Sequence, residues 1–404
     1  MAAGAVGTGL EFYDLTVYGL MAATLAPLFF PSDNTTASLI ATFAAFSVGL
    51  IARIAGGFLF GWIADRFGRR ISLIGSVTLM AASCGLMAIL PTFQAIGLAA
   101  PVLIVALRIC QGLAVGGELG ISYVFVGEHA PTKHRALALS SVGAGTTLGI
   151  LLGALVVAVL HLALTDEQVS NYGWRIAFGL GVGVALVGFL IRSRLQVAVQ
   201  TPRSSRISWR DLSGLLGRMV LNVIALSGIA SCYFTLYFFA PNWTIAAFDE
   251  DAETVHLVVA IAGVITMLAT VLGGWVCDRF GSRPTIWLCC AALAISFVLL
   301  PTLLSNVPGW LQLFAIAALA IVVGFYIASI ASLTFTTYPP TVRGLGCALA
   351  FNLGYGLIGG TAPMIALWLN QVAGIPSAFI WYPAGLCLIS IAAVLLLPYG
   401  SDYT

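Results

Sequence analysis

The chain carries very little charge. Of its 404 residues only 8% are Asp, Glu, Lys or Arg, whereas soluble domains average about 25%. Hydrophobic residues make up 60%, and the mean hydropathy is +1.04. A chain of this composition has no surface suited to water or to nucleic acid. It must lie in a lipid bilayer, where only helices and closed barrels satisfy the hydrogen bonds of the backbone.

The apolar runs lack the ten-residue alternation that a transmembrane barrel requires. They are continuous and about 20 residues or longer, which suits helices. We therefore predict an all-α integral membrane protein with twelve transmembrane helices. The predicted spans are 5–30, 36–64, 71–90, 100–126, 135–163, 174–194, 213–240, 254–278, 284–304, 310–337, 343–372 and 376–397.

Patterns typical of metal sites and disulfide frameworks are also missing. The eight cysteines fall within or at the ends of apolar runs, where free cysteine behaves as a small core residue. The four histidines are scattered near run ends, at 129, 134, 161 and 256. We expect no metal, no cofactor and no disulfide. The two acids in the first span also argue against a cleavable signal peptide.

A ten-residue motif occurs twice. Residues 61–70 read GWIADRFGRR and residues 274–283 read GWVCDRFGSR, with seven identical positions. Each copy lies between two apolar runs, as a charged turn at the membrane surface would. Two copies about half a chain apart predict two pseudo-symmetric six-helix bundles. We place the first at 1–194 and the second at 213–397, joined by a cytoplasmic linker at 195–212 and followed by a tail at 398–404.

The basic residues orient the chain. Fourteen of the 17 Lys and Arg residues lie at the span ends that face the loops after spans 2, 4, 6, 8 and 10. Those loops, and both termini, are expected to be cytoplasmic by the positive-inside rule. The opposite face carries the acids Asp33, Asp166, Glu167, Asp249, Glu250, Asp251 and Glu253.

Five charged residues lie well inside predicted spans, away from the span ends. Each charge in hydrocarbon costs about 2.5–3.5 kcal/mol or more, and such residues usually mark an ion or substrate path. Helical spacing places Glu11, Asp14 and Tyr18 on one face of span 1. The alternative is a set of structural ion pairs between helices. Three acids against two bases leave a surplus carboxylate, which favours proton coupling. The five residues are Glu11, Asp14, Arg53, Arg108 and Glu118.

The repeated motif also predicts a gate on the cytoplasmic side. Asp65 and Asp278 end spans 2 and 8, and Arg343 and Arg135 open spans 11 and 5. If the halves pack pseudo-symmetrically, each carboxylate meets the positive end of a helix in the other half and pairs with its arginine. The expected gating residues are Asp65, Arg66, Arg69, Glu128, Arg135, Asp278, Arg279 and Arg343.

Nearly the whole chain resembles the major facilitator superfamily and, within it, the metabolite:proton symporters. The doubled motif is the superfamily marker. The stretches 7–19 (GTGLEFYDLTVYG) and 108–118 (RICQGLAVGGE) resemble signatures of the symporter family. The resemblance implies two halves that rock about a midplane cavity lined by spans 1, 4, 7 and 10. Its members carry organic acids such as 2-oxoglutarate, citrate and shikimate, or zwitterions such as proline and betaine.

From the resemblance we expect a proton-coupled symporter of a small organic acid in a bacterial inner membrane. It is expected to be driven by the proton gradient and to function as a monomer. Proton coupling is assigned to Asp14, Glu11 and Arg108. Substrate binding is assigned to Arg108, Gln111, Tyr18, Arg53, Tyr233, Tyr237, Tyr326, Asn352 and Tyr355.

Several alternatives stay open. A zwitterion symporter and an organic-acid exporter fit the same pattern, and a receptor without transport activity is the alternative from another class. An enzyme is disfavoured, because no cluster of acids, metal ligands or nucleophiles lies at a water-facing edge. A channel would not need two mobile halves with matched gating turns.

Overall fold

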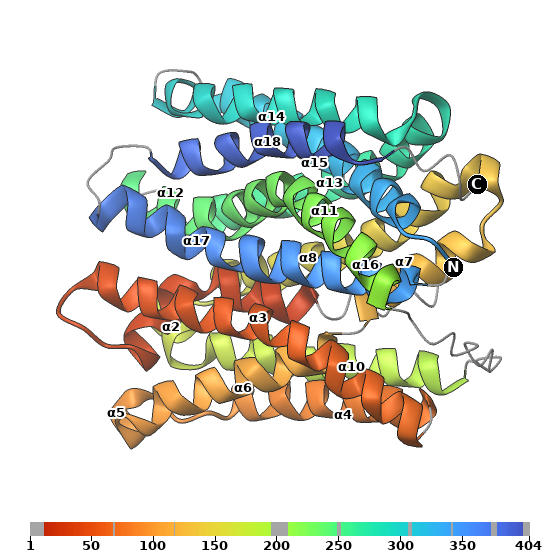
Figure 1. Cartoon of the computed structure of the whole chain (residues 1–404). Coiled ribbons are helices and arrows are strands. Elements are labelled where there is room, and N and C mark those ends of the chain that lie inside the picture. The colour runs from red at the N-terminus through yellow and green to blue at the C-terminus, as the bar shows by residue number, and fades with distance from the viewer. Residues whose placement is uncertain are drawn as a thin grey trace.

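The computed structural model describes residues 12–67, 69–116, 118–194, 209–248, 252–305, 309–340, 342–372 and 378–398. Nearly all of these residues are helical, and the long helices run across Figure 1 in one general direction. Helices from the first half of the chain lie in the lower part of the view and those from the second half in the upper part, with α8 between them. The prediction of an all-α membrane protein is confirmed.

The first half contains spans 1–6. Span 1 is helical over Phe12–Leu20 and continues as α2. A short helix, α5, precedes α6, and two short elements, α9 and the π-helical turn η2, precede α10. The elements are α2 (Ala22–Phe29), α3 (Thr35–Phe67), α4 (Arg69–Ala88), α5 (Phe93–Ile96), α6 (Ala99–Val115), α7 (Glu118–His129), η1 (Thr132–His134), α8 (Arg135–Ala163), α9 (Asp166–Gln168), η2 (Val169–Gly173) and α10 (Trp174–Arg194).

The second half contains spans 7–12, and π-helical turns interrupt two of them. Span 7 is α11, η3 and α12, and span 11 is α16, η4, α17 and η5. The bounds are α11 (Trp209–Phe234), η3 (Thr235–Phe239), α12 (Ala240–Phe248), α13 (Ala252–Phe280), α14 (Ser282–Ser305), α15 (Gly309–Thr337), α16 (Arg343–Phe351), η4 (Asn352–Gly359), α17 (Gly360–Leu367), η5 (Trp368–Val372) and α18 (Ala378–Leu396). Most of the predicted linker, 195–208, lies outside the described residues. Helix α11 begins at Trp209, within the last residues assigned to that linker.

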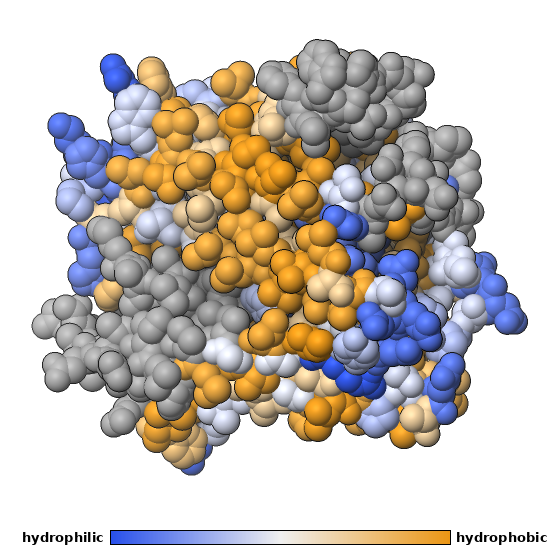
Figure 2. All heavy atoms as spheres, turned by 180° about the vertical axis from the view of Figure 1, so that it is seen from behind, coloured by the Kyte–Doolittle hydropathy of each residue, from blue (hydrophilic) through white to orange (hydrophobic). Residues whose placement is uncertain are grey.

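The helices are long and apolar enough to cross a bilayer. Among the described residues, eight helices meet that test alone, and the bent first span makes nine. The remaining three predicted spans are α4, α6 with α7, and α10. Figure 2 shows apolar side chains across the middle of one face, with hydrophilic ones gathered toward its left and right edges. This distribution fits an apolar belt between two aqueous faces.

Two spans differ from the single helices that the sequence predicted. The chain bends by 71° between Phe12–Leu20 and α2. Span 4 is divided, because α6 ends at Val115 and α7 begins at Glu118. Each span therefore has two parts that pack against different neighbours.

The two halves meet along α8 and α13, which run antiparallel over their whole length. Near one end Gly274 packs against Ser140 and the Ala136 carbonyl. Farther along, Gly263 lies against Leu151, and the rings of His161 and His256 meet at the other end. We call the end that carries Arg66, Arg135, Arg279 and Arg343 the basic end, and the end that carries Asp33, Asp166 and Glu253 the acidic end.

The described contacts join the halves at both ends. At the acidic end, the Asn242 amide of α12 donates to the Gly19 carbonyl over 3.0 Å, and its oxygen accepts from the Ala23 amide. Toward the basic end, the Asn352 amide donates to the Gly116 carbonyl. The structure is therefore an occluded arrangement, with neither end open along these contacts.

A glycine stripe on span 4 changes partner where the span divides. Gly112 and Gly116 lie against the α3 backbone at Gly49 and Arg53. Gly120, one turn farther, lies against Ala348 of α16 in the other half. Glycine allows such close approach because it has no Cβ. The stripe thus serves packing within one half and then packing between the halves.

Gly112→Val is expected to destabilise the first half strongly. An added Cβ would overlap the Gly49 carbonyl and lie 3.0 Å from the Ala52 Cβ, and forced overpacking costs about 1–3 kcal/mol or more. We expect a lower thermal unfolding midpoint in detergent. Gly179→Ala is the matched control, because an added Cβ there meets nothing within 4 Å. Equal midpoints for the two variants would contradict this account of the stripe.

Candidate functional site

A buried ion pair joins spans 1 and 4. The Arg108 Nη2 of α6 donates to Asp14 Oδ2 over 2.9 Å, and both residues are only 3% exposed. A charge in hydrocarbon is tolerated when it is paired, so each residue explains the presence of the other. The sequence assigned both side chains to proton coupling, and the structure pairs them directly.

Two further side chains complete the surroundings of the Asp14 carboxylate. Gln111 lies one turn beyond Arg108, and its Nε2 donates to Asp14 Oδ1 over 3.0 Å. The Cys84 thiol of α4 donates to the same oxygen over 3.4 Å. Sequence analysis treated Cys84 as a core residue and missed this contact. The hint was its place in an apolar span of the first half, which also holds Asp14 and Arg108.

Tyr18 connects this cluster to the second half. The Arg108 guanidinium lies 4.2 Å from the Tyr18 ring centroid, a cation–π contact. Tyr18 stacks on Phe46 of α3 with centroids 6.0 Å apart, and its hydroxyl donates to the Thr42 carbonyl. Phe46 in turn lies 5.5 Å from Phe238 of η3. Phe46 is a further contact residue that the sequence did not single out.

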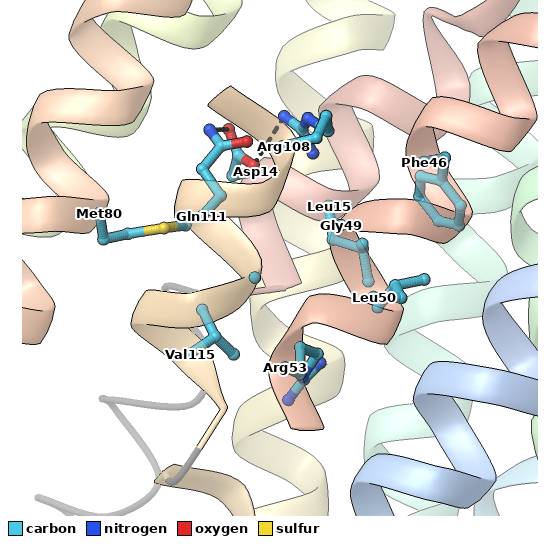
Figure 3. A pocket seen from close by; sticks show the side chains of 11 residues that line it. Asp14, Leu15, Phe46, Gly49, Leu50, Arg53, Met80, Arg108, Gln111 and Val115 are labelled. Atoms are coloured by element: carbon cyan, nitrogen blue, oxygen red, sulfur yellow. Dashed lines mark hydrogen bonds and ion pairs between the residues drawn. The ribbon is translucent and has the colours of Figure 1, made fainter. Parts of the chain in front are cut away.

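A small pocket opens beside the cluster between α3, α6 and span 1. Figure 3 shows Asp14, Arg108 and Gln111 together at one side of it, with Arg53 apart from them and lower on α3. Arg53 therefore shares the pocket with the cluster without joining it. Among the described residues, the buried Arg108 Nε and Gln111 Oε1 have no hydrogen-bond partner. These atoms leave one donor and one acceptor for a ligand.

The predicted tyrosines of the second half divide into two groups. Tyr233 and Tyr355 lie between the halves. Tyr233 lies near the Thr147 side chain of α8, and Tyr355 stacks on Phe351, which stacks on Tyr123 of α7. The sequence did not single out Tyr123.

The other two tyrosines face into their own half. The Tyr326 hydroxyl donates to the Ala225 carbonyl of α11 over 2.9 Å, and the Tyr237 hydroxyl bonds Thr266 over 2.5 Å. The structure does not bring these two hydroxyls to the Asp14 cluster. Helical spacing identifies a face, but the packing of neighbouring helices decides what that face meets.

The second motif copy forms a contact between the halves at the basic end. Asp278 Oδ1 and Oδ2 accept from the Ala136 and Leu137 amides, over 2.8 and 2.9 Å, at the start of α8. The motif glycines serve this geometry. Gly274 permits the close approach of α13 to α8, and Gly281 ends α13 with a φ of +92°, a conformation that favours glycine.

The arginines of the basic end contact an acid of the other half and several aromatic rings. Arg343 lies 3.6 Å from Glu128 of α7, an ion pair between the halves. The guanidinium groups of Arg343 and Arg135 lie 4.3 and 5.5 Å from the Phe335 ring centroid. Arg66 and Arg279 of the two motif copies each lie over the tryptophan four residues earlier. Asp278 and Arg135 are not paired among the described residues, and the predicted Asp65–Arg343 pair is untested because the Asp65 side chain lies outside them.

Some predicted residues cannot be placed. Glu11 lies outside the described residues, as do the side chains of Asp65, Arg69 and Glu118. Their roles stay predictions. Asn352, expected near the substrate, contacts the Gly116 carbonyl at the division of span 4, and its role also stays a prediction.

Asp278→Asn is expected to favour opening of the basic end. The two bonds between the halves exist only while that end is closed, and a carboxylate at a helix N-terminus contributes about 0.3–1 kcal/mol, up to about 2 when partly buried. The open population should rise by roughly twofold to thirtyfold. Ala331 is buried in the basic half of α15, so a thiol reagent reaches an Ala331→Cys side chain only when the basic end opens. The extent of its modification, measured by mass spectrometry, therefore reports the open population. Glu253→Gln, at the acidic end, is the control, and equal thiol modification in both variants would refute a gating role for Asp278.

Comparison with known proteins agrees with this architecture. The family model described as Major Facilitator Superfamily matches residues 5–351 and 229–402. The chain is 32% identical over 400 residues to the alpha-ketoglutarate permease of Escherichia coli (strain K12), covering 97% of this chain and 91% of that protein. The chain belongs to the major facilitator superfamily. The resemblance read from the repeated motif is thereby confirmed.

Other members of the superfamily are similar over most of their length. A putative proline/betaine transporter of Staphylococcus aureus (strain COL) is 27% identical over 413 residues, covering 98% of this chain and 87% of that protein. The crystal structure of a D-xylose-proton symporter superposes with a TM-score of 0.78 at 20% identity, covering 100% and 98% of the two chains. At that identity the likeness supports the twelve-helix major facilitator fold alone.

Proposed function

We propose that this superfamily member is a secondary transporter that moves a small organic acid together with protons across a bacterial inner membrane. The basic end is placed at the cytoplasm and the acidic end outside, in accordance with the positive-inside rule. The name of the relative from Escherichia coli, alpha-ketoglutarate permease, supports a carboxylate substrate. A chain of this class has no need of a resident cofactor, since the proton gradient supplies the driving force.

The observation that carries the proposal is the Asp14–Arg108–Gln111 cluster beside a pocket. Arginine binds a carboxylate well because its planar fork matches two oxygens. A substrate carboxylate that reaches Arg108 competes with Asp14 for the guanidinium. An Asp14 carboxylate that loses its cation in a buried place favours taking a proton. Binding of the acid and of the proton are thus linked at one pair of side chains.

The test is uptake into proteoliposomes of the purified protein with an inward-directed pH gradient. A panel of labelled organic acids, including 2-oxoglutarate, is compared with proline and betaine. Accumulation of an organic acid that collapses when an uncoupler is added supports the proposal. Specific binding without flux for every compound indicates a receptor, and outward flux alone indicates an exporter.

A zwitterionic substrate is the second candidate. Asp14 and Arg108 offer both signs of charge within one pocket, which suits a solute that carries both. The buried aromatic rings between the halves, including Tyr233 and Tyr355, suit a cationic ammonium group. If betaine inhibits uptake into the proteoliposomes and organic acids do not, the zwitterionic substrate is favoured.

A further inference from the structure

Two histidines from different halves face each other at the acidic end. His161 lies near the end of α8 and His256 near the start of α13. Their ring centroids are 5.1 Å apart, with 40° between the planes. No other described contact across the halves brings together two side chains that titrate near neutral pH.

The pair is buried in the occluded structure. His256 is 1% exposed, and its Nδ1 has no hydrogen-bond partner among the described residues. The His161 side chain is 10% exposed, and its Nδ1 lies 3.9 Å from an oxygen of Asp166, which is itself almost fully exposed. The charged partner that the described residues give the pair is thus a carboxylate in water on the His161 side.

The remaining packed elements give His256 no described acidic partner. Among the described residues, the nearby charged ones are Glu167 on α9, Arg175 at the start of α10 and Glu253 on α13, and neither η2 nor α12 carries a charge. The acids at 249–251, between α12 and α13, lie outside the described residues. Arg175 donates to the Asn171 and Leu90 carbonyls. The described residues thus provide no carboxylate placed to compensate a proton on His256.

Protonation therefore conflicts with closure. An imidazolium at His256 would hold a buried charge without an acceptor among the described residues, and a second one at His161 would repel it across the short gap between the rings. Separation of α8 from α13 at this end would admit water to both rings and remove both penalties. A proton that binds the separated rings better than the packed ones shifts the balance toward separation. Histidine ordinarily titrates near pH 6.5, within the range that a cell exterior reaches.

We propose that His161 and His256 form a second proton-binding site, distinct from the Asp14 cluster, that opens the acidic end when the medium outside is acidified. The inference rests on the proposed function, since it assumes alternating access. The site does not drive accumulation. It raises the fraction of transporters open to the outside at the pH at which an inward proton gradient exists.

Spin labels can be attached at chosen positions because few native thiols compete for them. Seven of the described cysteines are buried, and Cys110 is half-buried. Nitroxides attached to Thr165→Cys in the first half and Thr254→Cys in the second, in a Cys110→Ala background, report the separation across the acidic end. Both positions are exposed. Pulsed electron paramagnetic resonance distances are measured in detergent at pH 7.5 and pH 5.5 without substrate.

With both histidines present, the long-distance population is expected to grow severalfold at pH 5.5. His256→Gln and His161→Gln should each remove most of that growth. Both variants are made so that the test still stands if one of them fails to fold. His129→Gln, which changes an exposed histidine at the basic end, should respond like the parent. An undiminished response in both pair variants overturns the proposal.

Asp14→Asn separates this site from the coupling site. It should keep the distance response to pH, because the histidine pair is intact. Loss of the response in Asp14→Asn would assign it to the coupling cluster and also overturn the proposal. The measurement needs no flux, so a protein that transports nothing but shows the histidine-dependent response would refute the proposed function and leave this inference standing.

Discussion

Asp14→Asn is expected to abolish uphill uptake while substrate exchange continues. Asparagine has nearly the same shape as aspartate, and its amide oxygen accepts from one of the two donors, Arg108 or Gln111, while its NH2 group replaces the other oxygen. The amide takes up no proton. A wild-type protein coupled to one proton should accumulate substrate about tenfold per pH unit, since about 1.4 kcal/mol is a factor of ten. The variant should reach only equal concentrations on both sides. Uptake in proteoliposomes is measured with a pH gradient and, separately, as counterflow without one.

The matched control is Asp33→Asn, which removes an exposed carboxylate at the acidic end. It should accumulate substrate as the parent does. Normal gradient-driven accumulation in Asp14→Asn would remove Asp14 from the coupling role. Loss of counterflow as well would indicate that the Asp14–Arg108 pair is needed to hold the helices together.

Arg108→Lys is expected to weaken substrate binding by roughly tenfold or more in Kd. Lysine keeps the charge but loses the fork that binds a carboxylate through two nitrogens, and its ammonium does not stack on Tyr18 as a guanidinium does. A hydrogen bond to a charged group contributes about 1.5–3 kcal/mol, and about 1.4 kcal/mol is a factor of ten. Binding is measured by calorimetry or scintillation proximity with the purified protein.

Arg175→Lys provides the comparison. Arg175 also stacks on an aromatic ring, with 4.1 Å to the Trp174 centroid, but it lies at the acidic end outside the pocket. Its variant should bind substrate with unchanged affinity. If Arg108→Lys also binds normally, the arginine acts as a point charge or as a structural partner of Asp14.

The physics of the bilayer made part of this architecture predictable. Low charge and long apolar runs leave few folds open, and the repeated motif indicates two related halves. The pairing of Asp14 with Arg108 follows from the cost of leaving either charge alone in lipid. The Asp278 contact with the start of α8 follows from the need to cap a helix with a group of opposite sign.

Other features depend on packing that one sequence does not reveal. The hydroxyl groups of Tyr237 and Tyr326 turn into their own bundle because carbonyl and hydroxyl acceptors lie there. The bend in span 1 lies between Leu20 and Ala22, with no proline at that point. The histidine pair needs the register of α8 against α13. Antiparallel packing extended from the Asp278 contact would have placed His161 within about one helical turn of His256.

The antiparallel helices α8 and α13 form two rods that cross the membrane side by side and touch near their middle. Leu151 and Gly263 meet at that contact, roughly 22 Å along the axis from Ala136 and 15 Å from His161 at about 1.5 Å per residue. If the two helices tilt relative to each other about this contact, their separation at one end brings their other ends closer together. The Asp278 carboxylate at one end and the two imidazoles at the other then both act on the tilt angle between α8 and α13. A change made at either end is felt at the opposite side of the membrane without any chain of side chains to carry it.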